Sequence, residues 1–509
     1  MKQSLNALSL TDSSASDFRT SRCSRSVHHR LLTAMLFVVA WTIVNSAAWS
    51  AEHSDQRPNI ILVFIDDMGW GDFSCFGNTS VKTQNFDQLA AEGIRFEQFY
   101  VNSPICSPSR VAISTGQYPQ RWKITSFLNN RQNNIDRGMA QWLDPAAPML
   151  ARLLHDAGYA TGHFGKWHMG GQRDVGEAPL ITEYGFDKSL TNFEGLGPRV
   201  LGFKNAYNGK PAPPHTLGSD NLGRGEIRYV DRSVVTQEFT NAALDFIKQA
   251  ESEDRPFYVN LWPDDVHSPF FPPKARRGDQ TKRSLYHGVL DTADEQIGEL
   301  LSYVRDSKKL REQTIILACS DNGPEEGAGS AGHLRGFKTH LFEGGIRSPL
   351  IVWAPGYMQP DRMGSTNQTS YFAAIDLVPS LLALASVAVP DRIRFDGQAL
   401  PDVLMGRSTE SRSEPLFFRR PPDRDNFYGV KDLPDLAVRL GEWKLLCEYD
   451  GSDAMLFHVN DDPSEEKDLA AVEPERVAQL TQLVLEWHGK MPPDNGATYA
   501  QSPQPKGKQ

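Results

Sequence analysis

Five apolar runs along the chain have the length and composition of buried β-strands. Helix-like stretches separate each run from the next. Unbroken apolar strands that alternate with helices predict a mostly parallel sheet covered by helices on both faces. The predicted strands are Asn59–Ile65, Tyr159–Phe164, Phe257–Leu261, Thr314–Ala318 and Pro349–Trp353.

The stretches between these runs carry apolar residues at helical spacing. In Ala146–Ala157, for example, Met149, Leu150 and Leu153 share one face, and Gly158 stands where a helix would end. The pattern predicts an α/β fold. The predicted helices are Asn85–Gly93, Ala146–Ala157, Thr236–Ala250, Tyr286–Val304 and Ile375–Leu384.

The composition and the hydrophobic pattern of the sequence change near residue 405, which predicts a domain boundary there. A polar and then a Pro-rich stretch lead into Leu436–Cys447 and Ala454–Val459, which resemble antiparallel strands, and a helix is predicted at Glu473–His488. We therefore predict a main domain at 52–405 and a small α+β domain at 406–490. The composition of residues 491–509 predicts a disordered tail, since they are rich in Pro, Gln, Lys and Gly.

The first 51 residues have the composition of a secretory signal peptide. Five basic residues, the last of them Arg30, precede an apolar run from Leu31 to Val44 and then small residues. Fourteen residues are short for a membrane span, so no stable span is expected, although a retained anchor stays an alternative. The expected location is periplasmic or extracellular.

Composition narrows the class of protein. With 509 residues, 39% of them hydrophobic, the chain can build a large core, and its five cysteines are too few and too scattered for a disulfide framework. The net charge is −10, although the first 51 residues are basic, so the remainder is more acidic still. Nothing in this balance favours nucleic acid or an anionic membrane as a partner.

Carboxylates follow two of the predicted strands. Asp66 and Asp67 come directly after Asn59–Ile65, and Asp321 and Asn322 come shortly after Thr314–Ala318. Ligands of α/β sheets bind beyond the carboxyl ends of the strands, and hard oxygen donors suit Ca²⁺ or Mg²⁺ rather than zinc. The alternative is that these residues only cap helices or form turns. We favour a metal site, because adjacent acids repel each other unless a cation holds them.

A cysteine at the start of a short helical pattern is a candidate nucleophile. Cys106-Ser107-Pro108-Ser109-Arg110 opens an apolar run that stops at Gly116. A helix start directs backbone N–H groups at its ligand, and Arg110 adds a planar cation suited to a tetrahedral oxyanion. A buried structural cysteine is the simpler alternative. A cysteine phosphatase is disfavoured, because Ala112 stands where the arginine of a Cys-x5-Arg loop belongs.

A second motif runs from Gly158 to Gly170 and contains Gly-Lys-Trp-His. Lys166 and His168 lie two residues apart, so in an extended segment both side chains point to one face. A cation beside an imidazole suits the binding of an anion and proton transfer.

Together these motifs resemble the signatures of the formylglycine-dependent sulfatase family: Cys-x-Pro-x-Arg, then Gly-Tyr-x-Thr followed by Gly-Lys-Trp-His-x-Gly. The resemblance extends from about Asn59 to Trp487. It implies an alkaline-phosphatase-like fold and a formylglycine, made from Cys106 by a maturation enzyme, whose hydrate attacks the sulfate ester. It also implies a divalent cation, Ca²⁺ or Mg²⁺, held by Asp66, Asp67, Cys106, Asp321 and Asn322.

The resemblance assigns the remaining catalytic roles. Arg110, Lys166 and Lys338 would neutralise the sulfuryl oxygens. His168 would assist release of sulfate, and His267 would protonate the leaving alcohol. Asp264-Asp265 before His267 departs from the family pattern, and these acids are expected to raise its pKa or to contact substrate. Substrate contacts are expected from Lys166, His267, Lys338 and His333.

Two segments receive less specific predictions. Glu343 and Arg347 lie four residues apart and are expected to form a structural ion pair. The segment Gly195–Arg228, with its scattered basic residues, is expected to form either a sugar-facing lid or a plain loop.

The predicted function is hydrolysis of sulfate esters, with a sulfated polysaccharide or sugar as the default substrate of an exported enzyme. A phosphate or phosphonate monoester hydrolase of the same fold is an alternative, and a second acidic metal cluster would mark it. A carbohydrate-binding protein whose Cys106 is never oxidised is another.

Overall fold

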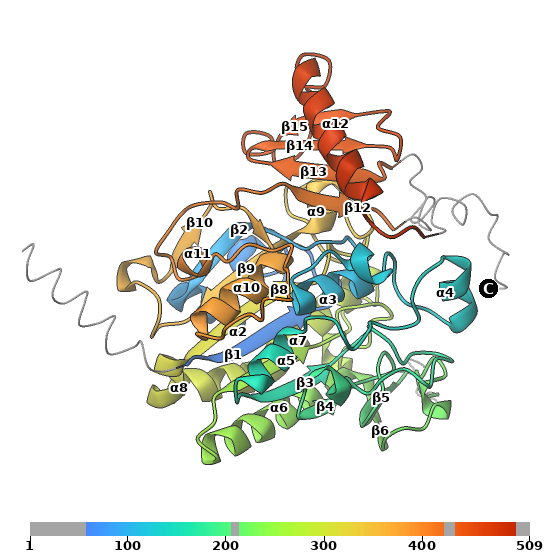
Figure 1. Ribbon diagram of the computed structural model, residues 1–509. Helices are drawn as coiled ribbons and strands as arrows, with labels where there is room; N and C mark the ends of the chain where they lie inside the picture. Colours follow the sequence, from blue (N-terminus) through green and yellow to red (C-terminus); the bar gives the residue numbers. More distant parts are fainter. Residues whose placement is uncertain (1–56, 205–212, 422–432, 495–509) are drawn as a thin grey trace, which may run out of the picture. The chain divides into compact units, whose positions relative to one another are not determined.

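The centre of the fold is a mixed β-sheet. The structure, a computed structural model, describes residues 57–204, 213–421 and 433–494, and within them nine strands form one sheet in the order β10-β2-β9-β8-β1-β7-β3-β4, with β11 paired to β2 (Figure 1). The strands are β1 (Asn59–Ile65), β2 (Ile94–Tyr100), β3 (Ala160–Gly165), β4 (Lys188–Leu190), β7 (Phe257–Trp262), β8 (Thr314–Ser320), β9 (Arg347–Trp353), β10 (Ser365–Asn367) and β11 (Phe372–Ala373).

Helices cover both faces of this sheet, as the side-chain alternation of β1 requires. Ile60, Leu62 and Phe64 pack with α3 (Cys106–Thr115), α5 (Leu150–Asp156) and α10 (Ala374–Leu384). Their neighbours Ile61 and Val63 pack on the opposite face with α2 (Gln84–Glu92), α6 (Val235–Ser252) and α7 (Lys282–Asp306). Two apolar faces per strand explain the unbroken apolar runs of the sequence.

Shorter elements complete the main part of the fold. A separate two-stranded parallel sheet consists of β5 and β6. These elements and the remaining short helices and 3₁₀ turns are β5 (Arg199–Phe203), β6 (Ile227–Asp231), α4 (Arg131–Asp136), α8 (Lys308–Gln313), α9 (Glu343–Ile346), α11 (Pro401–Leu404), η1 (Ser74–Phe76), η2 (Pro119–Trp122), η3 (Ile181–Tyr184), η4 (Ser219–Asn221), η5 (Arg232–Val234), η6 (Lys274–Arg276) and η7 (Pro360–Arg362).

The predicted strands and helices are present, with shifted ends. The helix predicted from Ala146 begins only at Leu150, because Asp144 forms a turn that accepts the N–H groups ahead of it. The sheet is mostly parallel, as predicted, but β9 runs antiparallel to both β8 and β2. Strand β2 was not predicted, because Arg95 and Glu97 interrupt its apolar residues.

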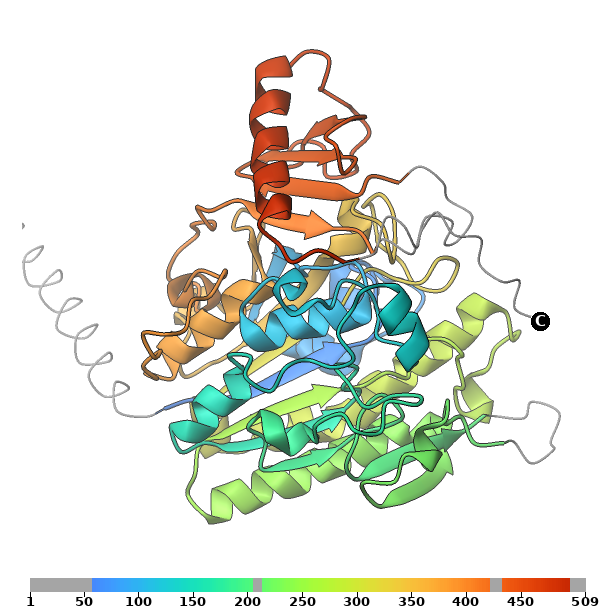
Figure 2. The same cartoon turned by 45° about the vertical axis from the view of Figure 1, so that its right-hand side comes forward.

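The C-terminal region forms its own antiparallel sheet. The order is β12-β13-β14-β15, and α12 (Pro474–Gly489) packs on it; Figure 2 shows this helix (red) along the C-terminal strands (orange). The stretch predicted as Leu436–Cys447 is a hairpin that turns at Gly441, which has a positive φ. The strands are β12 (Leu416–Arg419), β13 (Leu436–Leu440), β14 (Trp443–Cys447) and β15 (Met455–His458).

A buried charge cluster joins this sheet to the main one. Lys444 on β14 lies 2.9 Å from Glu343 and 2.8 Å from Glu465, and all three side chains are inaccessible to solvent. Glu343 also lies 3.4 Å from Arg347, the ion pair predicted from their spacing. Since a buried charge is costly without a partner, the cluster fixes how the two sheets pack.

Several predictions concern residues outside the described ones. The signal peptide at 1–51 and most of the predicted tail, 495–509, belong to this group. Asp494, which the tail prediction includes, is described and accepts hydrogen bonds from Arg419 and Thr125. Among the described residues, no helix combines the length and apolar character needed to cross a membrane. The cysteines described, Cys75, Cys106, Cys319 and Cys447, are all free.

Candidate active site

Polar side chains converge where four neighbouring parallel strands end. In the sheet β8, β1, β7 and β3 lie side by side and point the same way. Asp66 and Asp67 follow β1, and Asp321 and Asn322 follow β8. Lys166 follows β3 directly. The structure therefore brings together at one sheet edge the residues that the sequence placed at strand ends.

The three aspartates form a compact group of oxygen donors. Ligand atoms of Asp66, Asp67 and Asp321 lie within 4.8 Å of one another, and all three residues are fully buried. Asn322 donates its amide N–H to Asp67 Oδ1 at 2.8 Å, while its own Oδ1 is buried with no hydrogen-bond partner among the described residues. A buried amide oxygen without a donor beside three carboxylates fits a hard divalent cation such as Ca²⁺ or Mg²⁺.

The electrostatics of this group are strongly coupled. Burial raises the pKa of Asp66, but Lys166, His267 and Arg110 outweigh it and hold that pKa well below its usual range. Burial, reinforced by the charge of Asp66, raises the pKa of Asp321 to about 8. Three carboxylates at this spacing thus require several cationic neighbours.

Arg110 lies behind the carboxylates rather than in front of them. Its guanidinium donates to Asp66 Oδ1 at 3.1 Å, to Asp321 Oδ2 at 2.8 Å and to the Lys166 carbonyl at 3.0 Å. The side chain is fully buried. Two of its nitrogens hold the carboxylates and the Lys166 carbonyl, whereas its Nε is buried with no hydrogen-bond partner among the described residues, so the contact of Arg110 with sulfuryl oxygens stays a prediction.

Two lysines each contact one carboxylate of this group. Lys166 Nζ lies 2.6 Å from Asp66 Oδ2, and Lys338 Nζ lies 2.6 Å from Asp67 Oδ2. Burial lowers the pKa of Lys166, but the charge of Asp66 more than offsets it, so the ammonium stays charged. Gly165 before Lys166 has φ 128°, and a Cβ there would lie 2.1 Å from the Trp262 carbonyl oxygen. Only glycine at position 165 therefore allows the end of β3 to place Lys166 beside Asp66.

Cys106 is the first residue of α3, so it stands at a helix start as predicted. Its Sγ lies 4.0 Å from Asp67 Oδ1, and it is almost fully buried. The Ser107 hydroxyl fixes the helix start by accepting the Leu128 N–H at 2.9 Å. Gly116 ends the helix in a left-handed conformation, as predicted.

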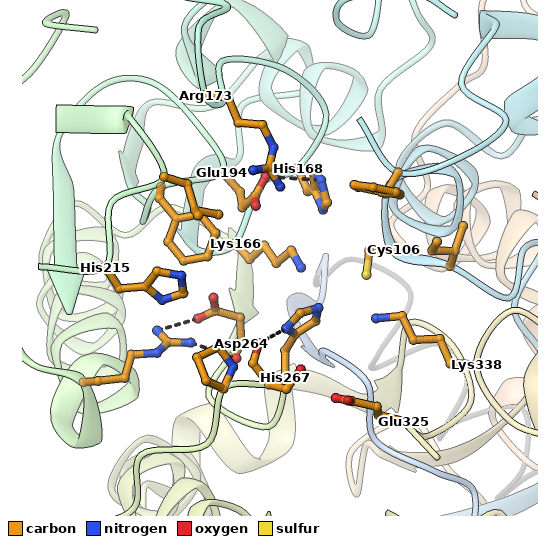
Figure 3. Close-up of a pocket in the computed structure, with 17 residues that line it drawn as sticks. Cys106, Lys166, His168, Arg173, Glu194, His215, Asp264, His267, Glu325 and Lys338 are labelled. Atoms are coloured by element: carbon orange, nitrogen blue, oxygen red, sulfur yellow. Dashed lines mark hydrogen bonds and ion pairs between the residues drawn. The ribbon is translucent and has the colours of Figure 1, made fainter. Parts of the chain in front are cut away.

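A cavity of about 300 Å³ opens above these groups (Figure 3). Lys166 and Lys338 point into it toward Cys106 from opposite sides, and the His267 ring lies below Lys166 and faces the end of Lys338. Its walls are formed by Ile105, Cys106, Phe127, Lys166, His168, Arg173, Phe193, Glu194, His215, Leu217, Arg232, Asp264, His267, Ser268, Pro269, Glu325 and Lys338.

His267 connects this cavity to the carboxylates. Its Nδ1 lies 2.6 Å from the Ser268 carbonyl oxygen, and its Nε2 lies 3.5 Å from Asp67 Oδ2. Burial lowers the pKa of His267, whereas Asp67 acts in the opposite direction. Burial together with the charges of Lys338 and Lys166 prevails, so the pKa of His267 is lowered, and both ring nitrogens face an acceptor to which a bound proton can be donated.

Residues 58–387, more than half of the chain, match the sulfatase family model. The chain belongs to the sulfatase family. Its members are sulfuric ester hydrolases, and this chain is one of them.

Similar proteins cover most of this sulfatase. The N-acetylgalactosamine-6-sulfatase of Sus scrofa is 32% identical over 402 residues, covering 74% of this chain and 71% of that protein. The N-acetylgalactosamine-6-O-sulfatase of Bacteroides thetaiotaomicron is 28% identical over 503 residues, covering 85% and 93%. A solved structure from work on glycosaminoglycan metabolism by Bacteroides thetaiotaomicron has a TM-score of 0.68 at 25% identity and covers 86% of this chain and 100% of that one. The predicted alkaline-phosphatase-like α/β fold is confirmed.

Some predictions on this sulfatase take a different form in the structure. Asp264 and Asp265 were expected to raise the pKa of His267 or to contact substrate. Arg232 instead lies 3.1 Å from Asp264 and 3.2 Å from Asp265, and the pKa of His267 is lowered rather than raised, with neither acid among its main influences. Asp264 does line the cavity, so its contact with substrate stays a prediction.

His333 is not brought to the cavity. Its ring lies edge-on to Trp70, with ring centres 5.0 Å apart, and it is absent from the lining residues. Its role as a substrate contact stays a prediction. His168 has φ 52°, so the segment is not extended as expected, yet His168 and Lys166 both line the cavity.

The segment Gly195–Arg228 contributes to the cavity through residues that the sequence did not single out. His215 and Leu217 line it, whereas the basic residues Lys204, Arg224 and Arg228 do not, and Lys210 lies outside the described residues. The other unpredicted lining residues include Arg173, Phe193 and Glu194, which lie between the Gly-Lys-Trp-His motif and this segment. Each is a single residue without a motif, so the sequence offered no signal for it.

Proposed function

We propose that this sulfatase hydrolyses sulfate esters of a sulfated sugar or polysaccharide, using a formylglycine made from Cys106 and a divalent cation, Ca²⁺ or alternatively Mg²⁺. One observation carries the proposal. Cys106 stands at the start of α3 where the cavity meets the group of Asp66, Asp67 and Asp321. An oxidised residue here would reach both a bound ester and a cation.

The residues around Cys106 suit in-line attack on a sulfate ester. A hydrated formylglycine beside a cation supplies an attacking hydroxyl and a second hydroxyl for release of sulfate. Lys166 and Lys338 would move their ammonium groups the short distance from Asp66 and Asp67 to the sulfuryl oxygens, where they offset the developing charge. Arg110 would keep the carboxylates in place from behind.

The two histidines would each transfer a proton in a different step of the reaction. His267, whose two nitrogens face acceptors, would give a proton to the oxygen of the leaving alcohol. His168, drawn above His267 across the cavity in Figure 3, would accept a proton when sulfate is released.

The cavity wall suits a sugar. The rings of Phe193 and His215 lie 5.1 Å apart, and Asp264 lines the same cavity as an acceptor for hydroxyl groups. The relatives named above as N-acetylgalactosamine-6-sulfatases support a sulfated sugar as substrate. We propose this class and no particular sulfate position.

The proposal includes export and maturation. The basic and apolar N-terminal segment would direct the chain to the periplasm or the outside, and a formylglycine-generating or sulfatase-maturating enzyme would oxidise Cys106. N-terminal sequencing of the exported protein would test the leader: a retained residue Met1 would contradict cleavage.

A phosphate or phosphonate monoester hydrolase is the less favoured function. In the described part of the chain, the candidate metal-ligating groups all share Asp66, so no separate second cluster is found there. A carbohydrate-binding protein with unmodified Cys106 is favoured by no observation of the site.

Mass spectrometry of the peptide spanning Cys106, combined with assays on matched esters, tests the proposal. We expect the mass of formylglycine in that peptide, and release of sulfate from a sulfated sugar well above release of phosphate from the same sugar phosphorylated at the same position. An unmodified cysteine in protein that turns over the sulfate ester would contradict the mechanism, and preferred phosphate release would contradict the substrate class.

A further inference from the structure

Glu194 is a buried acid on the cavity wall for which the proposed function has no catalytic role. It follows β4 and is only 3% exposed. Figure 3 shows its carboxylate beside His168 and below Arg173. Glu194 contacts His168 twice: its carbonyl oxygen accepts the His168 backbone N–H at 2.7 Å, and its Oε2 lies 3.2 Å from His168 Nε2.

The Leu128 carbonyl determines which nitrogen of His168 carries hydrogen. Nε2 lies 3.0 Å from this carbonyl oxygen, so in the neutral ring the hydrogen belongs on Nε2. The Glu194 carboxylate lies close to the same nitrogen, but its Oε2 forms no hydrogen bond among the described residues, so it acts on the ring through its charge. Nδ1 is buried with no partner among the described residues, and it therefore carries the free lone pair.

We propose that Glu194 is a positioning residue: its backbone carbonyl holds the His168 main chain, and its carboxylate favours the charge that the ring gains, so that Nδ1 is the atom that accepts a proton in the cavity while Nε2 keeps its hydrogen toward Leu128. The inference rests on the proposed function, which gives His168 the task of a base. When Nδ1 accepts a proton, its lone pair forms the new N–H bond, and the electron pair of the broken O–H bond stays on the donor oxygen. The ring then gains one positive charge, which the Glu194 carboxylate offsets at 3.2 Å.

Other partners for Glu194 are less close. Burial raises its pKa, and the charges of Lys166 and Arg173 act against this rise. Among the described residues, neither cation forms an ion pair with Glu194. Lys166 pairs with Asp66 instead. The remaining competitor is a hydroxyl group of the substrate, which would make Glu194 a substrate contact rather than a positioning residue.

The first test measures the ring directly and does not depend on activity. The full chain, labelled with ¹⁵N-histidine, is compared by NMR with Glu194→Gln, and His168→Gln assigns the signals. We expect Nε2 to carry the hydrogen and Nδ1 to be unprotonated in the parent, and Glu194→Gln to bind the second proton more weakly. Hydrogen on Nδ1, or proton binding that is unchanged in Glu194→Gln, would overturn the proposal.

The second test is a double-mutant cycle on turnover. Glu194→Gln should lower kcat by roughly 10- to 100-fold with little change in KM, as expected for loss of a group that orients a catalytic histidine. Glu194→Asp should restore part of the loss. In a His168→Gln background the same change should have almost no effect. Glu177→Gln, the same charge change at an exposed glutamate outside the cavity, should leave kcat unchanged.

The outcomes separate this inference from the proposed function. An equal loss in both backgrounds would show that Glu194 acts independently of His168 and would overturn the inference. A rise of KM on a sulfated sugar, absent for nitrophenyl sulfate, would reassign Glu194 to a sugar hydroxyl. If the parent releases no sulfate at all while the NMR result holds, the proposed function fails and the positioning of His168 stands.

Discussion

Asn322 and Asp67 are joined by a hydrogen bond of 2.8 Å between the amide nitrogen and a carboxylate oxygen, although 255 positions separate them in the sequence. The bond ties the end of β8 to the end of β1. It leaves the amide oxygen of Asn322 buried without a donor, next to three carboxylates. That oxygen is the clearest structural indication that a cation belongs to the site, since buried acceptors in proteins are normally satisfied.

Loss of one carboxylate should therefore weaken cation binding and activity together. In Asp321→Asn or Asp66→Asn the site keeps its shape but loses one negative charge, so Ca²⁺ should bind more weakly and stabilise the fold less. The measurement is Tm with and without Ca²⁺, together with the rate of sulfate release. Asp391→Asn, at an exposed position, serves as the control. A parent whose Tm and rate do not respond to a chelator would contradict the metal assignment.

The strand ends of this site were predictable because two independent patterns agree there. An apolar run marks a buried strand, and a polar pair directly after it marks the sheet edge, so Asp66 and Asp321 could be placed before their contacts were known. The direction in which a strand runs was harder to predict from the sequence. The reversal of β9 leaves no trace in the hydrophobic pattern, because that pattern reports burial on two faces and not strand orientation.

Residues that act through tertiary contacts were not predictable. Glu194 stands alone between Phe193 and Gly195, and only the fold places its carboxylate 3.2 Å from His168. Arg110 was recognised from its motif, but its position behind the carboxylates depends on α3 packing against the ends of β1 and β8. A motif thus identifies a residue, while the direction of its side chain depends on the surrounding elements.

Cys106→Ala should abolish turnover and leave the protein folded, because it removes the precursor of the group that forms the covalent bond to sulfur. Cys106→Ser should perform nearly as badly, since a serine sulfate has no second hydroxyl to expel sulfate. Release of sulfate and circular dichroism measure the two properties. Cys75→Ser, at a free cysteine away from the cavity, is the control. Sustained turnover by Cys106→Ser would contradict the hydrate mechanism.

Glu92 gives a prediction on stability and pH. Burial raises its pKa, but hydrogen bonds from Arg305, Arg311 and Trp353 outweigh this and lower the pKa to about 2. A carboxylate with a lowered folded-state pKa stabilises the protein above its unfolded pKa of about 4.3, and this contribution is lost as the pH falls toward the folded value.

Glu92→Gln should therefore lower the Tm at pH 7, and its difference from the parent should shrink between about pH 5 and pH 3. Glu312→Gln, at a nearby exposed glutamate, should match the parent throughout. A difference in Tm that stays constant down to pH 3 would show that the side chain acts through packing rather than through its charge.

His267 allows a test based on the leaving group. A sugar alkoxide leaves poorly without a proton, whereas nitrophenolate leaves unaided, and general acid catalysis contributes roughly 10²–10⁴-fold. His267→Ala should thus slow hydrolysis of a sulfated sugar by about that factor and hydrolysis of nitrophenyl sulfate by distinctly less. The ratio of kcat/KM values on the two substrates is the measurement.

Lys166→Ala provides the comparison, because an ammonium group that binds sulfate is needed for either substrate and its loss should slow both reactions alike. Equal losses on both substrates for His267→Ala would assign His267 to the sulfate as well. The acid would then have to be sought at Lys338, which points into the same cavity, because His333 lies outside its walls against Trp70. His267 stays the expected acid because it lines the cavity beside Cys106 and Lys338, with Asp67 3.5 Å from its Nε2 acting against the burial that lowers its pKa.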